Sequence, residues 1–78
     1  MDIEDEIVVD ARGHRCPVPT LRLRRAVAEA PAGSVLRLIA DDPMARIDAV
    51  HFAGEAGLEV VSVVDEAGVL AVRVRKPL

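Results

Sequence analysis

The apolar residues of the chain fall into two alternating patterns. Four short runs are rich in valine, leucine and isoleucine, and two longer segments with apolar residues every three to four positions separate the first three runs. Runs of β-branched residues favour strands, whereas the three-to-four spacing gives a helix one apolar face. We therefore predict the order βαβαββ, with strands at 7–9, 35–40, 58–64 and 69–74 and helices that begin at Pro19 and Pro43.

Proline, glycine and aspartate residues indicate where the helices begin and end. A proline fits the first turn of a helix, and the residue before a proline is kept out of helical geometry, so the first helix is expected to begin at Pro19. The Pro-Ala-Gly-Ser segment at 31–34 ends it. For the second helix we predict Asp42 as the N-cap, Pro43 as the first helical residue and Gly57 as the C-terminal cap.

The last two strands are expected to form a hairpin through the Asp-Glu-Ala-Gly segment at 65–68. Arg73, Arg75 and Lys76 place positive charge on the last strand, which we interpret as an exposed edge protected against strand addition. One sheet covered by two helices is the simplest way to bury these strands, because right-handed crossovers place both helices on the same face. The predicted fold class is an α/β two-layer sandwich.

Composition narrows the class of protein. The 78 residues, 51% hydrophobic and 29% charged, fit one globular domain, which we place at 7–78. A net charge of −3 argues against direct nucleic-acid binding. A single cysteine excludes an intrachain disulfide and favours a reducing compartment.

The N-terminal segment and the lengths of the apolar runs bear on localisation. Residues 1–6 carry four acidic side chains and are expected to form a solvated tail, unlike a signal peptide. No apolar run approaches the length needed to cross a bilayer. We expect a cytoplasmic protein without a membrane partner.

The single cysteine, Cys16, lies in the predicted loop between the first strand and the first helix. The N–H groups of the first helical turn, such as those of Val18, Thr20 or Leu21, favour an anion. Arg12 and Arg15 add positive potential, with His14 as a further contributor, and the prolines at 17 and 19 stiffen the loop. These features predict an outward-facing, reactive thiolate at Cys16. The alternative is a buried, inert cysteine.

Metal and cofactor sites are not expected. One cysteine and two histidines, His14 and His51, fall short of a structural zinc site. The pair Asp41 and Asp42 is better explained by helix capping than by metal ligation, since no third oxygen ligand is evident. We interpret His51 as a surface or boundary residue of the second helix.

Two motifs then give a family resemblance over roughly residues 7 to 77. Cys16-Pro17-Val18-Pro19 stands at the start of the first helix and follows Asp10-Ala11-Arg12-Gly13, while Ala40-Asp41-Asp42-Pro43 opens the second helix and Ile47-Asp48 continues it. In these blocks the chain resembles the TusA (SirA-like) family of small sulfur-carrier proteins. The resemblance implies a two-layer sandwich with a mixed four-stranded sheet.

The resemblance also implies a function. Cys16 would carry sulfur as a persulfide, accept it from a cysteine desulfurase or another persulfidic protein, and pass it to an acceptor protein. Family members serve tRNA thiolation, molybdenum-cofactor biosynthesis or sulfur oxidation. Whether such a protein turns over as a sulfurtransferase or only carries sulfur stays open, and a monomer is the simplest form of such a carrier. The residues assigned to the site are Cys16, the supporting Arg12, Arg15, Pro17 and Pro19, and the second motif Asp41, Asp42 and Pro43.

The chain departs from the family pattern at two positions. Many members have a second cysteine after a His-Phe pair in the second helix, but here Ala53 follows Phe52, so the chemistry rests on Cys16 alone. Position 14, often apolar in the family, is histidine, which we interpret as a solvated loop residue. Other functions stay open at this point: a non-catalytic interaction or regulatory module, its variant with a redox-sensing cysteine, and, disfavoured by charge and the lack of stacking aromatics, RNA binding.

Overall fold

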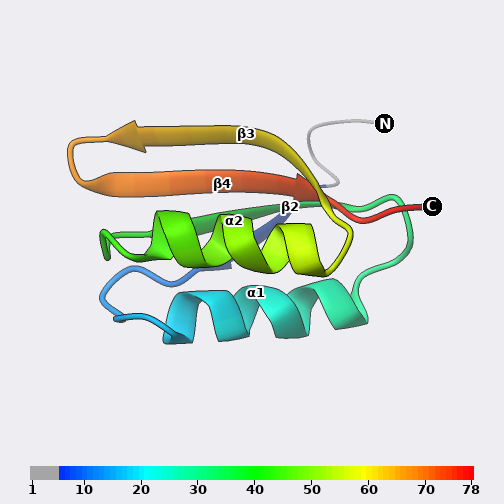
Figure 1. The fold of residues 1–78 in the computed structure, drawn as a ribbon, viewed down its shortest axis with the longest axis horizontal. Coiled ribbons are helices and arrows are strands. Elements are labelled where there is room, and N and C mark those ends of the chain that lie inside the picture. The colour runs from blue at the N-terminus through cyan, green and yellow to red at the C-terminus, as the bar shows by residue number, and fades with distance from the viewer. Residues whose placement is uncertain (1–5) are drawn as a thin grey trace.

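The computed structural model describes residues 6–78, and its elements follow the predicted order βαβαββ. Both helices lie on the same side of the sheet, where α1 contacts β1 and β2 and α2 contacts β4 and β3 (Figure 1). No helix among these residues is both long and apolar enough to cross a bilayer. The elements are β1 (Ile7–Asp10), α1 (Val18–Glu29), β2 (Val35–Ala40), α2 (Ala45–Glu55), β3 (Glu59–Glu66) and β4 (Val69–Arg75).

The four strands form one mixed sheet in the order β1-β2-β4-β3. β1 is parallel to β2, whereas β4 is antiparallel to both of its neighbours. The two-layer sandwich with a mixed four-stranded sheet is therefore confirmed. Because β1 and β2 are parallel, the loops that follow them lie at the same end of the sheet.

The prediction that the last strand forms an exposed edge is wrong. The crossover from β2 through α2 does not place β3 directly beside β2 but one strand position away from it. The hairpin that follows β3 then places β4 between β2 and β3. Arg73 therefore lies opposite Arg37 of β2 on one side and Ser62 of β3 on the other. The edges of the sheet are β1 and β3.

The core lies between the sheet and the helices. Alternate residues of β2 and β4 point into it, because side chains alternate between the two faces of a strand. Leu23 and Val27 of α1 and Phe52 of α2 close it from the other side. Burying one leucine, valine or phenylalanine side chain stabilises a fold by roughly 1.5–3 kcal/mol. The buried strand residues are Leu36, Leu38, Ala40, Leu70, Val72 and Val74.

On the opposite face of the sheet, Glu6 lies between two arginines. Its Oε1 is 3.2 Å from Nε of Arg37 and 3.1 Å from Nε of Arg73, and its side chain is only 8% exposed. Glu6 was predicted to be part of a solvated tail, and for this residue the prediction is wrong, because the two arginines of neighbouring strands bind its carboxylate. The rest of that predicted tail, residues 1–5, lies outside the described residues.

The helix boundaries differ from the prediction by one or two residues. α1 begins at Val18, one residue before Pro19. α2 begins at Ala45 with Met44 as its N-cap, so Asp42 is not the helix cap but accepts a hydrogen bond from the Met44 N–H at 3.0 Å in the preceding turn. Gly57 follows the last residues of α2 with a φ of +72°, as a C-terminal glycine does.

The hairpin between β3 and β4 is tighter than predicted. The strands extend to Glu66 and from Val69, which leaves a turn of Ala67 and Gly68 in place of the four-residue loop. Both turn residues have positive φ, 52° and 80°, as the twist of a two-residue hairpin requires. Gly68 accepts this geometry without strain because it has no side chain.

Candidate functional site

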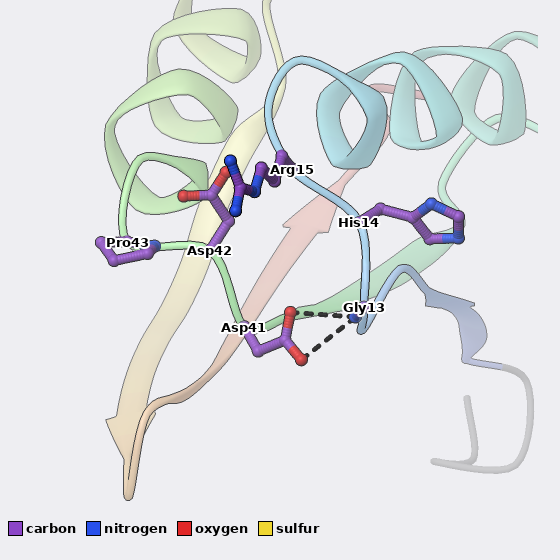
Figure 2. Close-up of a pocket in the computed structure, with 6 residues that line it drawn as sticks. All are labelled: Gly13, His14, Arg15, Asp41, Asp42 and Pro43. Atoms are coloured by element: carbon purple, nitrogen blue, oxygen red, sulfur yellow. Dashed lines mark hydrogen bonds between the residues drawn. The ribbon is translucent and has the colours of Figure 1, made fainter.

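Two loops meet at the end of the sheet where the carboxyl ends of β1 and β2 lie. The first, residues 11–17, joins β1 to α1 and carries Cys16, and the second, residues 41–44, joins β2 to α2. The N–H of Ala11 donates to the carbonyl of Ile39 at 2.7 Å, which extends the β1–β2 pairing into the loops. The parallel strands thus place the two sequence motifs side by side (Figure 2).

Both aspartates of the second loop bind the backbone of the first. The carboxylate of Asp41 accepts the N–H of Gly13 with its two oxygens at 2.9 and 3.0 Å (Figure 2). Oδ2 of Asp42 accepts the N–H of Cys16 at 2.6 Å, while its Oδ1 accepts the N–H of Met44. The predicted capping role therefore needs correction: the pair fixes the cysteine loop to the β2–α2 loop.

Cys16 is half-buried and packs against the core. The peptide bond between Cys16 and Pro17 is cis. It borders a groove of about 400 Å³ between the loop and α2. The sequence could not place His51 relative to Cys16, and the structure brings both residues to this groove. The groove is lined by Cys16, Pro17, Met44, Ile47, Asp48 and His51.

The environment of Cys16 raises the pKa of its thiol. Burial is the largest cause, followed by the negative charges of Asp42 and Asp48 and a hydrogen bond between the thiol and the Asp42 carboxylate. The prediction that the surroundings of Cys16 favour a thiolate is therefore wrong. The two carboxylates that oppose the thiolate come from the second loop and from α2, which lie 26 or more residues away in sequence.

Two of the three first-turn donors that were expected to favour a thiolate, those of Val18 and Leu21, are engaged elsewhere. The N–H of Val18 donates to the carbonyl of Arg15 at 2.9 Å, and the N–H of Leu21 donates to the carbonyl of Pro17 at 3.0 Å. The N–H of Cys16 itself is taken by Asp42. Backbone carbonyls thus satisfy two of the donors that the sequence suggested as an anion site, and a carboxylate binds the N–H of the cysteine itself.

The two arginines of the cysteine loop have different surroundings. Arg12 binds Asp10 with its Nε and Nη2, and hydrogen bonds from this side chain lower the pKa of Asp10 to about 2. The side chain of Arg15 reaches toward Asp42 (Figure 2), and its charge adds to the Cys16 and Met44 N–H groups in lowering the pKa of that carboxyl. A role of either arginine toward a bound persulfide stays a prediction.

The two prolines of the first motif and the histidine before it are also placed. Pro19 is fully buried and anchors the start of α1 in the core, whereas Pro17 is exposed and lines the groove. His14 points away from Asp41 and Asp42 (Figure 2). Pro43 lines a second hollow of about 470 Å³. The other residues of this hollow are Gly13, His14, Arg15, Asp41 and Asp42. Within residues 6–78 no three His, Cys, Asp or Glu side chains are grouped so that they could hold a metal ion.

Comparison with known proteins assigns the chain to a family. Residues 7–76 match the family model of the sulfurtransferase TusA. The chain belongs to the TusA family. A sulfur carrier protein TusA from Pseudomonas entomophila (strain L48) is 37% identical over 75 residues, which is 96% of this chain and 94% of that protein. A second from Pseudomonas putida (strain GB-1) is 35% identical over the same length.

A solved structure supports the same assignment. The crystal structure of a SirA-like protein from Desulfitobacterium hafniense superposes with a TM-score of 0.82 at 28% sequence identity. The superposition covers 92% of this chain and 99% of that chain. The TusA fold is thus shared over nearly the whole length of both proteins.

Sequence reasoning did not include in the site the N-cap and the α2 residues that line the groove beside the cysteine. Met44, Ile47, Asp48 and His51 recur at three-to-four spacing after the second motif, so they share one helix face. That spacing was a usable signal once the first turn of α2 was placed beside the cysteine loop. The sequence pattern alone did not give that placement.

Proposed function

We propose that this TusA-family protein is a sulfur carrier that holds sulfur as a persulfide on Cys16. The observation that carries the proposal is the position of the chain's one thiol. It borders an open groove, on a loop held by the second family motif. The curated relatives named sulfur carrier proteins support the same role.

The transfer step needs only a thiol and a persulfide. In loading, the Cys16 thiolate attacks the outer sulfur of a donor persulfide, the donor's S–S bond breaks, and the donor leaves as a thiolate that takes up the proton lost by Cys16. Unloading repeats this step with an acceptor thiol as the attacking group. The reaction is balanced without an oxidant or a reductant, and the chain has no second cysteine that could displace the sulfur as a disulfide forms.

The partners follow from this chemistry. We propose a cysteine desulfurase or another persulfidic protein as the donor and a sulfur-accepting protein as the recipient, in tRNA thiolation, molybdenum-cofactor biosynthesis or sulfur oxidation. A persulfide carrier with an unpaired thiol is suited to a reducing compartment such as the cytoplasm. It docks on two partners in turn, for which a monomer suffices.

Intact-mass spectrometry tests the proposal. The protein is incubated with a cysteine desulfurase and cysteine, then measured before and after a reductant, beside the Cys16→Ala variant. We expect one added sulfur that the reductant removes and that the variant never acquires. A protein that gains no sulfur from several desulfurases, or gains it equally in the variant, contradicts the proposal and favours an interaction module instead.

A further inference from the structure

The outer edge of β3 carries backbone groups that no other element pairs. β3 is the outermost strand beside β4 (Figure 1), and within residues 6–78 the backbone of 62–66 forms hydrogen bonds to no element other than β4. Because the backbone groups of a strand alternate between its two sides, alternate residues of 62–66 direct their N–H and carbonyl groups outward. Such an edge is a template for a further strand.

The features that usually protect a sheet edge lie outside this part of β3. The opposite edge strand, β1, has only four residues, and a short edge strand offers little backbone for pairing. In β3 a bulge between Val60 and Ser62 interrupts the pairing near the start of the strand. Residues 62–66 then pair without interruption with β4, and none of them is proline, lysine or arginine. This half of β3 is therefore open to strand addition.

An apolar groove lies beside this edge on the helix side of the sheet. Val63 is opposite the buried Val72 of β4, so its side chain faces the helices and borders the groove. Ile47 and His51 of α2 line this groove and also the one that contains Cys16, so the edge and the cysteine are joined along one face of α2. The groove has a volume of about 510 Å³ and is lined by Arg46, Ile47, Val50, His51, Val60 and Val63.

The unpaired charges near the edge are mainly negative. Asp65 and Glu66 are exposed at the end of β3, and Asp48 lies in the groove of Cys16. Within residues 6–78 these three carboxylates form no salt bridge, and Arg46 is the arginine that lines the groove beside them. The other charged groups nearby are already paired: Arg73 with Glu6 at 3.1 Å, Arg75 with Glu59 at 3.3 Å and His51 with Glu55 at 3.3 Å.

The charge of β3 disfavours a second copy of the chain as the occupant of this edge. β3 contains Glu59, Asp65 and Glu66 and no basic residue, so pairing it with its copy would bring like charges together. A partner that brings lysine or arginine to the edge avoids this repulsion. We therefore propose that the edge of β3 at residues 62–66 binds an extended segment of a partner protein, in which basic residues alternate with apolar ones.

The segment adds to the sheet as a further strand, and its backbone pairs with the outward groups of β3. Its apolar side chains lie on the helix side, in the groove with Val60 and Val63, and its basic side chains lie on the open face near Glu66. The inference goes beyond the proposed function, because it assigns a surface and a chemistry to a partner of the chain. Since the two grooves share Ile47 and His51, a partner bound in this way also lies beside the groove of Cys16.

A peptide binding experiment tests the proposal. The probe is a short synthetic peptide of alternating valine and lysine with a fluorescent label, and its control has glutamate in place of lysine. Binding to the full chain without added sulfur is followed by fluorescence anisotropy. We expect the lysine peptide to bind about tenfold more tightly, because the carboxylates at the edge attract it and repel the control. Equal affinities, or no binding of the lysine peptide at millimolar concentration, would overturn the proposal.

Two matched variants separate strand addition from a general effect of charge. Val64→Lys places a lysine on the edge strand, whereas Val69→Lys places one on β4, which has a neighbour on both sides. Both valines are exposed on the open face of the sheet, 45% and 38%, and both variants change the charge equally. We expect Val64→Lys to weaken binding of the lysine peptide about tenfold and Val69→Lys to change it at most about twofold. An equal loss in both variants would contradict strand addition.

A double variant covers the case in which Val64→Lys does not fold. Asp65→Asn with Glu66→Gln alters only exposed side chains and removes the carboxylates at the edge. We expect this variant to lose most of the preference for the lysine peptide over the glutamate peptide. A preference that stays unchanged in the folded variant would show that these carboxylates do not select the partner.

Amide hydrogen exchange measured by NMR locates the bound peptide on the molecule. We expect slower exchange at alternate residues of 62–66 when the lysine peptide is present, and unchanged exchange in β1. Slower exchange confined to α1 or β1 would overturn the proposal. None of these measurements uses sulfur-loaded protein, so a failure of the sulfur-carrier function would leave their results intact.

Discussion

Lys76 stabilises the end of α1 that lies furthest from the cysteine. Its Nζ donates to the carbonyls of Val27 and Ala30, each at 2.8 Å, in a partly buried position. The last carbonyls of a helix have no partner within the helix, and a cation there also interacts favourably with the helix dipole. Lys76 follows β4, so these two bonds tie the end of the sheet to the helix layer.

Replacing Lys76 with Met keeps an unbranched side chain that is one atom shorter and removes both bonds. Hydrogen bonds to a charged group each contribute about 1.5–3 kcal/mol, but the carbonyl of Val27 keeps the N–H of Ala30 as a donor at 3.3 Å when the lysine is removed. We therefore expect the free energy of unfolding to fall by about 2–3 kcal/mol. For a domain of this size, a loss of that order lowers the melting temperature by roughly 10–20 °C.

Urea unfolding followed by circular dichroism measures the change. Arg75→Met is the matched control, because Arg75 is the preceding residue and pairs with Glu59 at 3.3 Å on the surface, where both side chains are at least half exposed. Such a pair contributes at most about 1 kcal/mol. A Lys76→Met protein whose stability falls by no more than that of Arg75→Met would refute the reasoning. Cys16 alkylation is expected to be unchanged in both.

Two further predictions concern acid stability and the core. The pKa of Asp10 is lowered from 3.8 to about 2, mainly by hydrogen bonds from its arginine partner, so this contribution to stability is complete above about pH 4 and is lost as the pH falls toward 2. We expect Asp10→Asn to be less stable than the wild type at pH 7 and equally stable near pH 2 in urea titrations; a difference that does not change with pH would contradict this. The buried hydroxyl of Thr20 has no hydrogen-bond partner within residues 6–78, so Thr20→Val is expected to raise the unfolding free energy by about 1 kcal/mol, and a lower thermal stability would show that the hydroxyl is satisfied.

The order of elements could be predicted from the sequence because it depends on local patterns. The apolar runs, the helical spacing and the prolines are read within a few residues of one another. The strand order depends on the crossover through α2, which leaves room for one strand between β2 and β3. β4 fills that position by way of the hairpin. No local sequence pattern contains this information. For this reason the charged strand with Arg73 was mistaken for an edge.

The candidate site divides in the same way. Cys16 and its two motifs could be predicted because their residues are adjacent in the chain. The pKa of the thiol could not, because the carboxylates that raise it come from Asp42 and Asp48, and their distance from the sulfur is set by the parallel pairing of β1 and β2. Glu6 was misjudged for a related reason, since its partners lie on two strands that are remote in sequence.

The place of β4 in the sheet has a consequence for synthesis of the protein. β1, α1 and β2 form a unit of local contacts that can pair as soon as residue 40 has left the ribosome. β2 and β3 gain their shared neighbour only when residues 69–75 have emerged. Until then, the backbone of β2 has no partner strand on the side that β4 later occupies. Leu36 and Leu38, which are buried in the folded protein, belong to this strand. An unpaired strand with apolar side chains is the kind of surface that chaperones protect. Stalled or truncated chains are therefore expected to lose the centre of the sheet, although the cysteine loop is already complete.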